Sequence, residues 1–261
     1  MKKLLLSFQF LTIVPFKGAE EASEKEIGSS SIYFPLVGFA EGIVIAVMAM
    51  LLIKILPSQV VNALIVLVLV IVNGGLHLDG LADTFDAVAS RGDREKKLLI
   101  MKDSSIGPIG VISIVLVLLL GYVMLNAVHF YSAGNLYYAI LILMQVSTRW
   151  AMVPALCYGL SARKDGLGRL FIEHTGNREL LTSTVIIFII AVVDGITFSN
   201  MNLFICFSML IFPVIYGFSV LAIMFAKRHF HGLTGDSLGA VNEIARLIFL
   251  LITVIWLQQS I

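Results

Sequence analysis

The sequence predicts an all-α membrane protein, a polytopic bundle of about seven transmembrane helices with a cytoplasmic N-terminus. Hydrophobic residues make up 59% and charged residues 13% of the 261 residues, and the mean hydropathy is +0.97. Soluble domains contain about 45–50% apolar and about 25% charged residues, so this composition indicates a membrane protein. The apolar residues form continuous runs rather than alternating ones, which favours helices over strands.

The first 31 residues are expected to form an N-terminal cytoplasmic segment. Residues 3 to 14 form an apolar run after two lysines. At about a dozen residues this run is too short to cross a bilayer, which needs about 20. It lacks a small-residue cleavage site, and Pro15 closes it, so it does not resemble a cleaved signal peptide. We predict a retained interfacial or re-entrant segment.

Seven later runs are long and apolar enough to cross a membrane. The expected spans are residues 32–56, 59–77, 107–130, 135–160, 180–199, 202–226 and 244–260. Turn-forming residues separate several of them, such as Pro57 and Gly134. No internal repeat is visible at a fixed period. We therefore expect one membrane domain over residues 1–261, in which residues 32–261 form the helix bundle.

The lysines and arginines orient these spans. Residues 1–31 hold four of the 18 basic residues, and residues 78–106, 161–179 and 227–243 hold five, four and two. The connections between these, near residues 57–58, 131–134 and 200–201, hold none. The positive-inside rule places the basic connections in the cytoplasm. Their three loops are therefore the expected catalytic loops.

An acidic cluster, HLDGLADTFD at residues 77–86, follows the second predicted span. In a helix, Asp79, Asp83 and Asp86 recur at i, i+4 and i+7, which places three carboxylates on one face. Like charges at this spacing repel each other, whereas Mg²⁺ binds carboxylates together with substrate phosphate oxygens. His77 can orient an aspartate or act as an acid or base. A solvated helix face is the alternative, but such faces mix acidic and basic residues.

A second polar patch, MKDSSIG at residues 101–107, precedes the third span. Lys102, Asp103 and Ser104 place charged and hydroxyl groups at a helix start, where phosphate can bind. Capping of that helix by Asp103 or Ser105 is an equally good interpretation.

Two further patches lie on the same predicted side of the membrane. KDGLGRLF, residues 164–171, is a basic loop with glycines, and LTGDSLGAVNEIAR, residues 233–246, carries Asp236 and Glu243. Asp236 is also a suitable N-cap for the last helix. Together with the acidic cluster, these patches predict a cytoplasm-facing site for a metal and a phosphorylated substrate. The chemistry that the residues indicate is Mg²⁺-dependent phosphoryl transfer.

One arginine lies well inside a predicted span. Arg149 falls in the fourth span, and an arginine within the membrane is costly and often functional. We predict that it contacts the substrate. The structural alternative is an ion pair with Glu41, the only acid deep in the first span.

Three segments resemble the motifs of a known family. GGLHLDGLADTFDA, MKDSSIGPIG and GLTGDSLGAVNE, in this order and at these separations, resemble the cobalamin synthase family, also called adenosylcobinamide-GDP ribazoletransferases. FLTIVPF and YFPLVG resemble the N-terminal segments of the family, so the resemblance covers essentially the whole chain.

The resemblance implies an enzyme of the bacterial or archaeal cytoplasmic (inner) membrane, with Mg²⁺ as cofactor and an active site facing the cytoplasm. The hydroxyl of α-ribazole, or of α-ribazole phosphate, would attack the cobinamide-linked phosphorus of adenosylcobinamide-GDP. GMP would leave, and adenosylcobalamin or its phosphate would form. Asp79 and Asp83 would bind the metal, Asp86 would be a ligand or base, and Lys102 would contact a phosphate. Asp103, Gly235, Asp236 and Glu243 also match family motifs.

Two other function classes were weighed against this transferase. An ion-coupled secondary transporter would show inverted repeats and charges near the membrane midplane, whereas most acids here lie at the edge. A CDP-alcohol-type phosphotransferase has a similar acidic motif, but Asp83 stands where that pattern has arginine. The net charge of +1 does not indicate a nucleic-acid partner. The expected partners are the two substrates and membrane lipid, and a homo-oligomer is compatible with the sequence.

Overall fold

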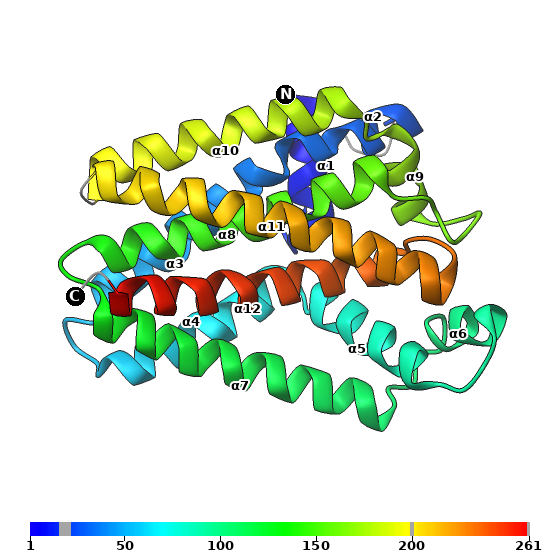
Figure 1. Cartoon of the computed structure of the whole chain (residues 1–261), viewed down its shortest axis with the longest axis horizontal. Coiled ribbons are helices and arrows are strands. Elements are labelled where there is room, and N and C mark those ends of the chain that lie inside the picture. The colour runs from blue at the N-terminus through cyan, green and yellow to red at the C-terminus, as the bar shows by residue number, and fades with distance from the viewer. Residues whose placement is uncertain (16–21, 199–200, 260–261) are drawn as a thin grey trace.

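The computed structural model describes residues 1–15, 22–198 and 201–259, and this part of the chain folds into helices without a strand. Figure 1 shows the arrangement of these elements. They are α1 (Lys2–Leu11), α2 (Glu24–Gly28), η1 (Ser29–Tyr33), α3 (Phe34–Leu52), α4 (Ser58–Val72), α5 (Leu76–Ala89), α6 (Arg94–Ile100), α7 (Pro108–Tyr131), α8 (Leu136–Tyr158), α9 (Leu167–His174), α10 (Asn177–Phe198), α11 (Met201–Phe230) and α12 (Gly235–Gln259). The predicted all-α class is confirmed.

Six helical segments of the described chain are long and apolar enough to cross a membrane. They are residues Glu24–Leu52, Pro108–Tyr131, Leu136–Tyr158, Asn177–Thr197, Phe204–Phe230 and Gly235–Gln259. The helices α4 and α5 meet the same criterion only as a pair, which brings the number to seven. The chain is therefore an integral membrane protein, with six apolar spans in the described residues, or seven if α4 and α5 count as one bent span, against the seven that the sequence predicted.

A sharp bend separates α4 from α5. The two helices enclose an angle of 84°. Gly74 and Gly75 form the turn with φ values of +61° and +76°, a region that glycine enters without steric cost. The second predicted span, 59–77, is therefore too long at its C-terminal end, because α4 ends at Val72. We treat α4 as the membrane span and α5 as a helix at the end of the bundle, outside the spans.

The predicted loops are largely helical. Residues 78–106 contain most of α5 and all of α6, and residues 161–179 contain α9 and the start of α10. Residues 227–243 belong mainly to α11 and α12, so the connection there is only residues 231–234. Hydropathy had located the apolar parts of these helices and missed their polar extensions. The predicted ends at residues 199 and 260 lie outside the described residues.

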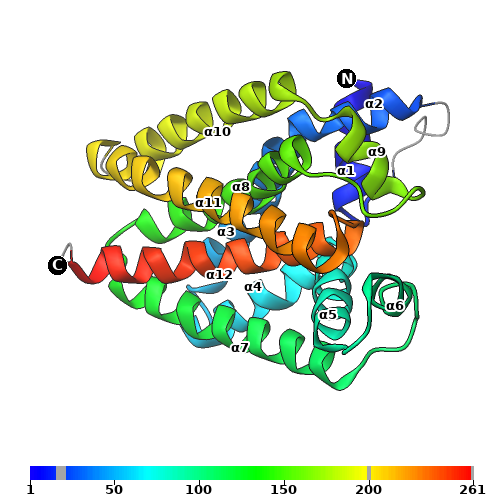
Figure 2. The same cartoon turned by 45° about the vertical axis from the view of Figure 1, so that its right-hand side comes forward.

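The long helices run roughly side by side and alternate in direction, as Figure 1 shows. The α4–α7 connection, the α8–α10 connection and the α11–α12 turn all lie at the right-hand end, together with α5, α6 and α9. The α3–α4 and α7–α8 connections lie at the opposite end. The basic connections therefore share one end, as predicted. In Figures 1 and 2, α1 runs across the long axis, as expected for an interfacial segment.

The central helix is α8, and 94% of its most apolar stretch is buried inside the protein. It packs against α3, α10, α11 and α12. Gly38 and Gly42 allow the close approach of α3, because a Cβ at these positions would lie 2.4 Å from the Gln145 backbone oxygen and 2.7 Å from Ile142 Cα. Small residues at such crossings let membrane helices pack tightly.

Candidate functional site

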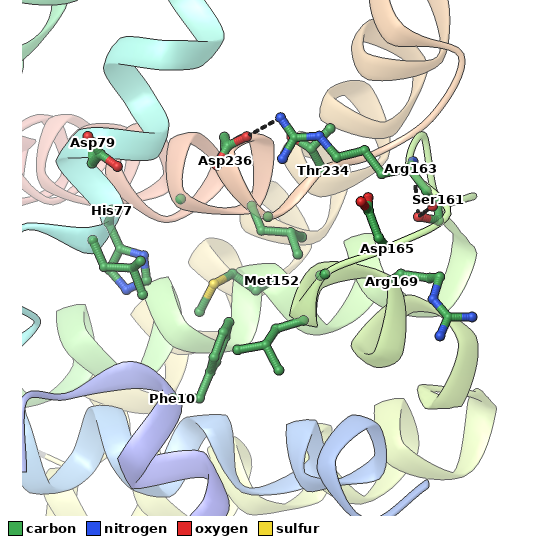
Figure 3. Close-up of a pocket in the computed structure, with 17 residues that line it drawn as sticks. Phe10, His77, Asp79, Met152, Ser161, Arg163, Asp165, Arg169, Thr234 and Asp236 are labelled. Carbon is green, nitrogen blue, oxygen red and sulfur yellow. Dashed lines mark hydrogen bonds and ion pairs between the residues drawn. The ribbon is translucent and has the colours of Figure 1, made fainter. Parts of the chain in front are cut away.

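A cleft of about 270 Å³ lies at the end of the bundle where the basic connections gather. Its walls come from α1, α5, α8, the segment before α9, α9 itself and the first turns of α12. Four of the predicted site residues line it, namely His77, Asp79, Gly235 and Asp236. Figure 3 shows Asp79 and Asp236 on neighbouring helices, with Phe10 and Met152 on the opposite wall. The structure thus brings the first and last polar motifs together.

Close packing of α5 on α12 holds these two motifs in place. Gly80 lies against the backbone of α12, where a Cβ would be 2.6 Å from the backbone oxygen of Asp236. On the other helix, a Cβ at Gly239 would lie 3.1 Å from the backbone oxygen of His77. Contacts this short leave no room for a side chain, so the separation of the two acidic motifs depends on glycine.

We expect Gly80→Ala to push α5 away from α12. The added methyl group meets backbone atoms that cannot rotate aside, and such overpacking costs about 1–3 kcal/mol. Thermal unfolding in detergent should show a lower midpoint. Gly217→Ala is the matched control, because nothing lies within 4 Å of the added Cβ on α11. Equal midpoints for the two variants would contradict the close approach of α5 and α12.

The carboxylates near the cleft act on each other electrostatically. The pKa of Asp83, which is half-buried on α5, is raised to about 7, mainly because burial removes water from the carboxylate. The nearby charges of Asp79, Asp236 and Asp86 raise it further, and Arg163 opposes them. A cation placed among these acids would therefore be stabilised.

The donor set of this acidic group fits Mg²⁺. Asp79, Asp83 and Asp236 offer the hard oxygen ligands that this ion prefers, and Mg²⁺ commonly uses one or two carboxylates with water and substrate phosphate. Among the described residues, no three His, Cys, Asp or Glu side chains already converge on a common metal position.

Asp86 has a different arrangement from the one predicted. Its Oδ2 accepts a hydrogen bond from the Gly107 backbone N–H at 2.7 Å, and its Oδ1 accepts one from Gly110 at 2.8 Å. A Cβ on Gly107 would lie 2.5 Å from Oδ1 of Asp86, and a Cβ on Gly110 would lie 2.3 Å from its Oδ2. Asp86 does not line the cleft. Its carboxylate instead ties α5 to the start of α7, where free N–H groups favour a negative charge.

We expect Asp86→Asn to weaken this connection and to leave any dependence of activity on Mg²⁺ as it is in the wild type. The amide NH₂ cannot accept, so one hydrogen bond to a charged group is lost, worth about 1.5–3 kcal/mol. A lower unfolding midpoint with an unchanged Mg²⁺ dependence of turnover is the expected result. If Asp86→Asn needed much more Mg²⁺, Asp86 would be a metal ligand, as the sequence had suggested.

Arg149 lies beneath the cleft and does not line it. It is 1% exposed and forms a two-pronged ion pair with Glu41, with Nη2–Oε1 at 2.7 Å and Nε–Oε2 at 2.9 Å. Its Nη1 donates to Asn242 Oδ1 at 3.2 Å and to His77 Nε2. The ion pair that the sequence offered as the alternative is therefore present. Arg149 also reaches the cleft indirectly, through His77.

The bond from Arg149 defines the state of His77. An arginine only donates hydrogen bonds, so Nε2 of His77 must accept and the ring is neutral, with its proton on Nδ1. The structure therefore leaves Nδ1–H, a donor, as the polar group of His77 that is free to act in the cleft. This arrangement suits orientation of a ligand better than removal of a proton.

Glu243 continues this buried network along α12. It is 1% exposed, its Oε2 accepts from Arg246 Nη1 at 2.7 Å, and its Oε1 accepts from Asn242 at 3.2 Å. It does not line the cleft, although the sequence suggested a substrate contact. The polar side chains of α3, α5, α8 and α12 are therefore linked beneath the cleft.

The 101–107 segment reaches only the rim of the cleft. Lys102 Nζ lies 3.4 Å from Asp165 Oδ2, and Asp165 lines the cleft. Asp103 is exposed, and hydrogen bonds from Ser105 hold its pKa below the usual value. Ser104 is exposed as well, and neither Asp103 nor Ser104 lines the cleft.

The sequence had marked residues 164–171 as a basic loop of the site, but it had not singled out Arg163, just before this loop, or Arg169 in α9, both of which line the cleft. Arg163 Nη2 lies 3.0 Å from Asp236 Oδ2, as the dashed line in Figure 3 shows. Arg169 pairs with Glu173 at 3.0 Å. The Nε atoms of both arginines are buried and have no hydrogen-bond acceptor among the described residues. The pattern KDGLGRLF marked this segment as a basic loop, but the pairing of Arg163 with α12 is not visible in the sequence.

Comparisons with known proteins cover nearly the whole chain. A family model described as cobalamin-5-phosphate synthase matches residues 3–254. A relative from Thermodesulfovibrio yellowstonii is 34% identical over 258 residues, covering 96% of this chain and 95% of the relative. A relative from Geotalea daltonii is 34% identical, with 96% of each chain covered. Both relatives are named adenosylcobinamide-GDP ribazoletransferase. No solved structure matches the chain.

Proposed function

The chain belongs to the cobalamin-5-phosphate synthase family, and from this premise we propose that it catalyses the reaction of an adenosylcobinamide-GDP ribazoletransferase. The phosphocobinamide group would pass from adenosylcobinamide-GDP to α-ribazole or α-ribazole phosphate, with release of GMP. The observation that supports this most is the cleft itself, whose lining combines Asp79 and Asp236 with Arg163 and Arg169. Acidic groups for a metal and basic groups for phosphates are the pairing that phosphoryl transfer requires.

We assign Mg²⁺ to the acidic group. Asp79 and Asp83 would hold the ion, and Asp236 would contribute from α12. When bound, Mg²⁺ neutralises the charge of the diphosphate and stabilises the leaving phosphate. Burial raises the pKa of Asp83 most, and repulsion from Asp79, Asp236 and Asp86 raises it further. This repulsion supports the assignment, because a bound cation would relieve it.

The basic side chains of the cleft would hold the diphosphate. The buried Nε groups of Arg163 and Arg169 lack acceptors, and phosphate oxygens would supply them. Lys102 at the rim would contact a phosphate from the other side. In the reaction, the acceptor hydroxyl oxygen forms a bond to the cobinamide-linked phosphorus, and the bond from that phosphorus to the GMP oxygen breaks. The proton of the hydroxyl passes to a carboxylate of the acidic group, and GMP leaves with the electron pair.

We place this cleft at the cytoplasmic face of the inner membrane. The connections that carry most of the lysines and arginines lie at the cleft end, and such residues favour the cytoplasmic side. Large apolar side chains on α7, such as Val111, Leu119 and Val123, are about half exposed and fit contact with lipid.

The test is GMP release by the purified protein in liposomes. The assay supplies adenosylcobinamide-GDP, Mg²⁺ and α-ribazole or α-ribazole phosphate, and each component is omitted in turn. We expect release only when all three are present, with no release after Mg²⁺ is removed by EDTA. Release without the acceptor would indicate hydrolysis rather than transfer. No release from folded protein would contradict the proposed function and favour an ion-coupled transporter, which vesicle uptake would reveal.

A further inference from the structure

A second buried acid lies at the end of the bundle opposite to the cleft. Asp194 is 2% exposed, and neither of its carboxyl oxygens has a hydrogen-bond partner among the described residues. It belongs to the last turns of α10, which lie at the end of the bundle opposite to α5 and α9 (Figure 1). The proposed transfer reaction does not use Asp194. An unpaired buried polar group is costly, so its presence calls for a function.

Asp194 points into a cavity within the membrane. This cavity of about 250 Å³ lies between α3, α8 and α10. Apart from Asp194 and Thr197, its lining side chains are apolar. The Thr197 hydroxyl donates to the Val193 backbone oxygen at 2.7 Å, so its proton is already in use. The cavity therefore offers little polar compensation for a charge.

The surroundings favour the neutral form of Asp194. No basic side chain lines the cavity in the described part of the chain. A carboxylate among apolar side chains within the membrane is strongly disfavoured. The carbonyl groups at the C-terminal end of α10 also disfavour a negative charge nearby. A neutral carboxyl group presents one O–H donor and one carbonyl acceptor.

The cavity opens towards lipid. Ile43 and Val47 on α3 and Val193 on α10 line it, and they are 38%, 49% and 51% exposed. These residues belong to helices that cross the membrane, so the exposed parts of their side chains face acyl chains. A ligand would therefore enter from the bilayer.

We propose that this cavity binds the hydroxyl group of a membrane-soluble alcohol. A hydroxyl can accept the carboxyl proton of Asp194 and donate its own proton to the carbonyl oxygen, which satisfies both unpaired oxygens without a net charge. An amine or a carboxylate would instead bring a charge into the apolar cavity. The alkyl chain of the alcohol would extend past Ile43, Val47 and Val193 into the lipid.

The test uses a lipid-soluble carbodiimide on the full chain in vesicles. Dicyclohexylcarbodiimide adds the O–H of a protonated carboxyl group across its C=N bond, and the adduct rearranges to a stable N-acylurea. Peptide mass mapping then measures labelling of Asp194 with 1-decanol, with decane or with neither. We expect Asp194 to be labelled, 1-decanol to slow the labelling severalfold, and decane to leave it unchanged.

Four results would overturn the proposal. Equal protection by decane and 1-decanol would show that the hydroxyl is not recognised. Labelling of Asp194 by a water-soluble carbodiimide would show that the cavity faces water. No labelling would show that lipid-soluble molecules do not reach Asp194. Protection that increases with the density of protein in the vesicles would show that a second copy of the chain covers it. Asp194→Asn removes the reactive carboxyl group, so residue 194 should not be labelled in this variant. Its unchanged GMP release would confirm that the variant is folded. The labelling does not depend on the proposed transferase activity.

Discussion

Replacing Asp83 by asparagine is expected to lower the rate of GMP release by about a hundredfold or more at saturating substrates. Stabilisation of a phosphoryl transition state by a metal ion is worth several kcal/mol, and about 1.4 kcal/mol corresponds to a factor of ten in rate. Asparagine keeps the shape of the side chain but removes the charge that would hold Mg²⁺. The measurement is initial-rate GMP release across a range of Mg²⁺ concentrations.

The control for Asp83→Asn is Asp93→Asn at the start of α6. Asp93 is exposed, and its Oδ1 accepts a hydrogen bond from the Lys96 backbone N–H at 3.0 Å. Asparagine caps a helix about as well as aspartate, so this variant should behave as wild type. If the rate of Asp83→Asn stayed within about threefold of the control, the decrease would be too small for the loss of a metal ligand. It would remove Asp83 from the metal site.

The second large effect is expected on stability, from the buried pair of Glu41 and Arg149. Glu41→Gln leaves the Arg149 guanidinium without its counter-charge at a position that is 1% exposed. Removing one partner of a buried pair costs about 3–5 kcal/mol, because the other charge stays buried and unpaired. The unfolding midpoint in detergent should therefore fall sharply.

Two further variants make this prediction specific. The double variant Glu41→Gln, Arg149→Met should be more stable than Glu41→Gln, since it buries no unpaired charge. Glu26→Gln is the matched surface change, because Glu26 pairs with Lys2 in an exposed ion pair, and its midpoint should match wild type. A double variant less stable than Glu41→Gln would indicate that Arg149 is held mainly by His77 and Asn242.

The sequence predicted most of the fold because hydropathy and charge act over long stretches. The apolar spans and the clustering of basic connections at one end follow from two facts alone: apolar segments partition into lipid, and charged segments stay in water. The bend at Gly74 and Gly75 was missed, because two glycines at the end of an apolar run do not reveal a turn by hydropathy. The polar first turns of α12 were assigned to a loop for the same reason.

The candidate site was predictable only where one helix carries it. The spacing of Asp79 and Asp83 predicted a shared helix face, and α5 provides it. The contacts between elements could not be predicted in this way. The pairing of Arg163 with Asp236, and the hydrogen bonds of Asp86 to the start of α7, depend on how distant segments pack.

The shortness of α4 has a consequence for the lipid around the cleft. Its 15 residues are about 22 Å long, whereas the hydrocarbon core of a typical bilayer is about 30 Å thick. If α4 begins at the level of the head groups on one side, the turn at Gly74 would lie below their level on the other side, and α5 would begin in this recess. Such hydrophobic mismatch is relieved by local thinning of the bilayer, at a modest cost for each ångström. Bilayer thickness thus becomes one of the variables that set how easily a water-borne nucleotide reaches the acidic helix.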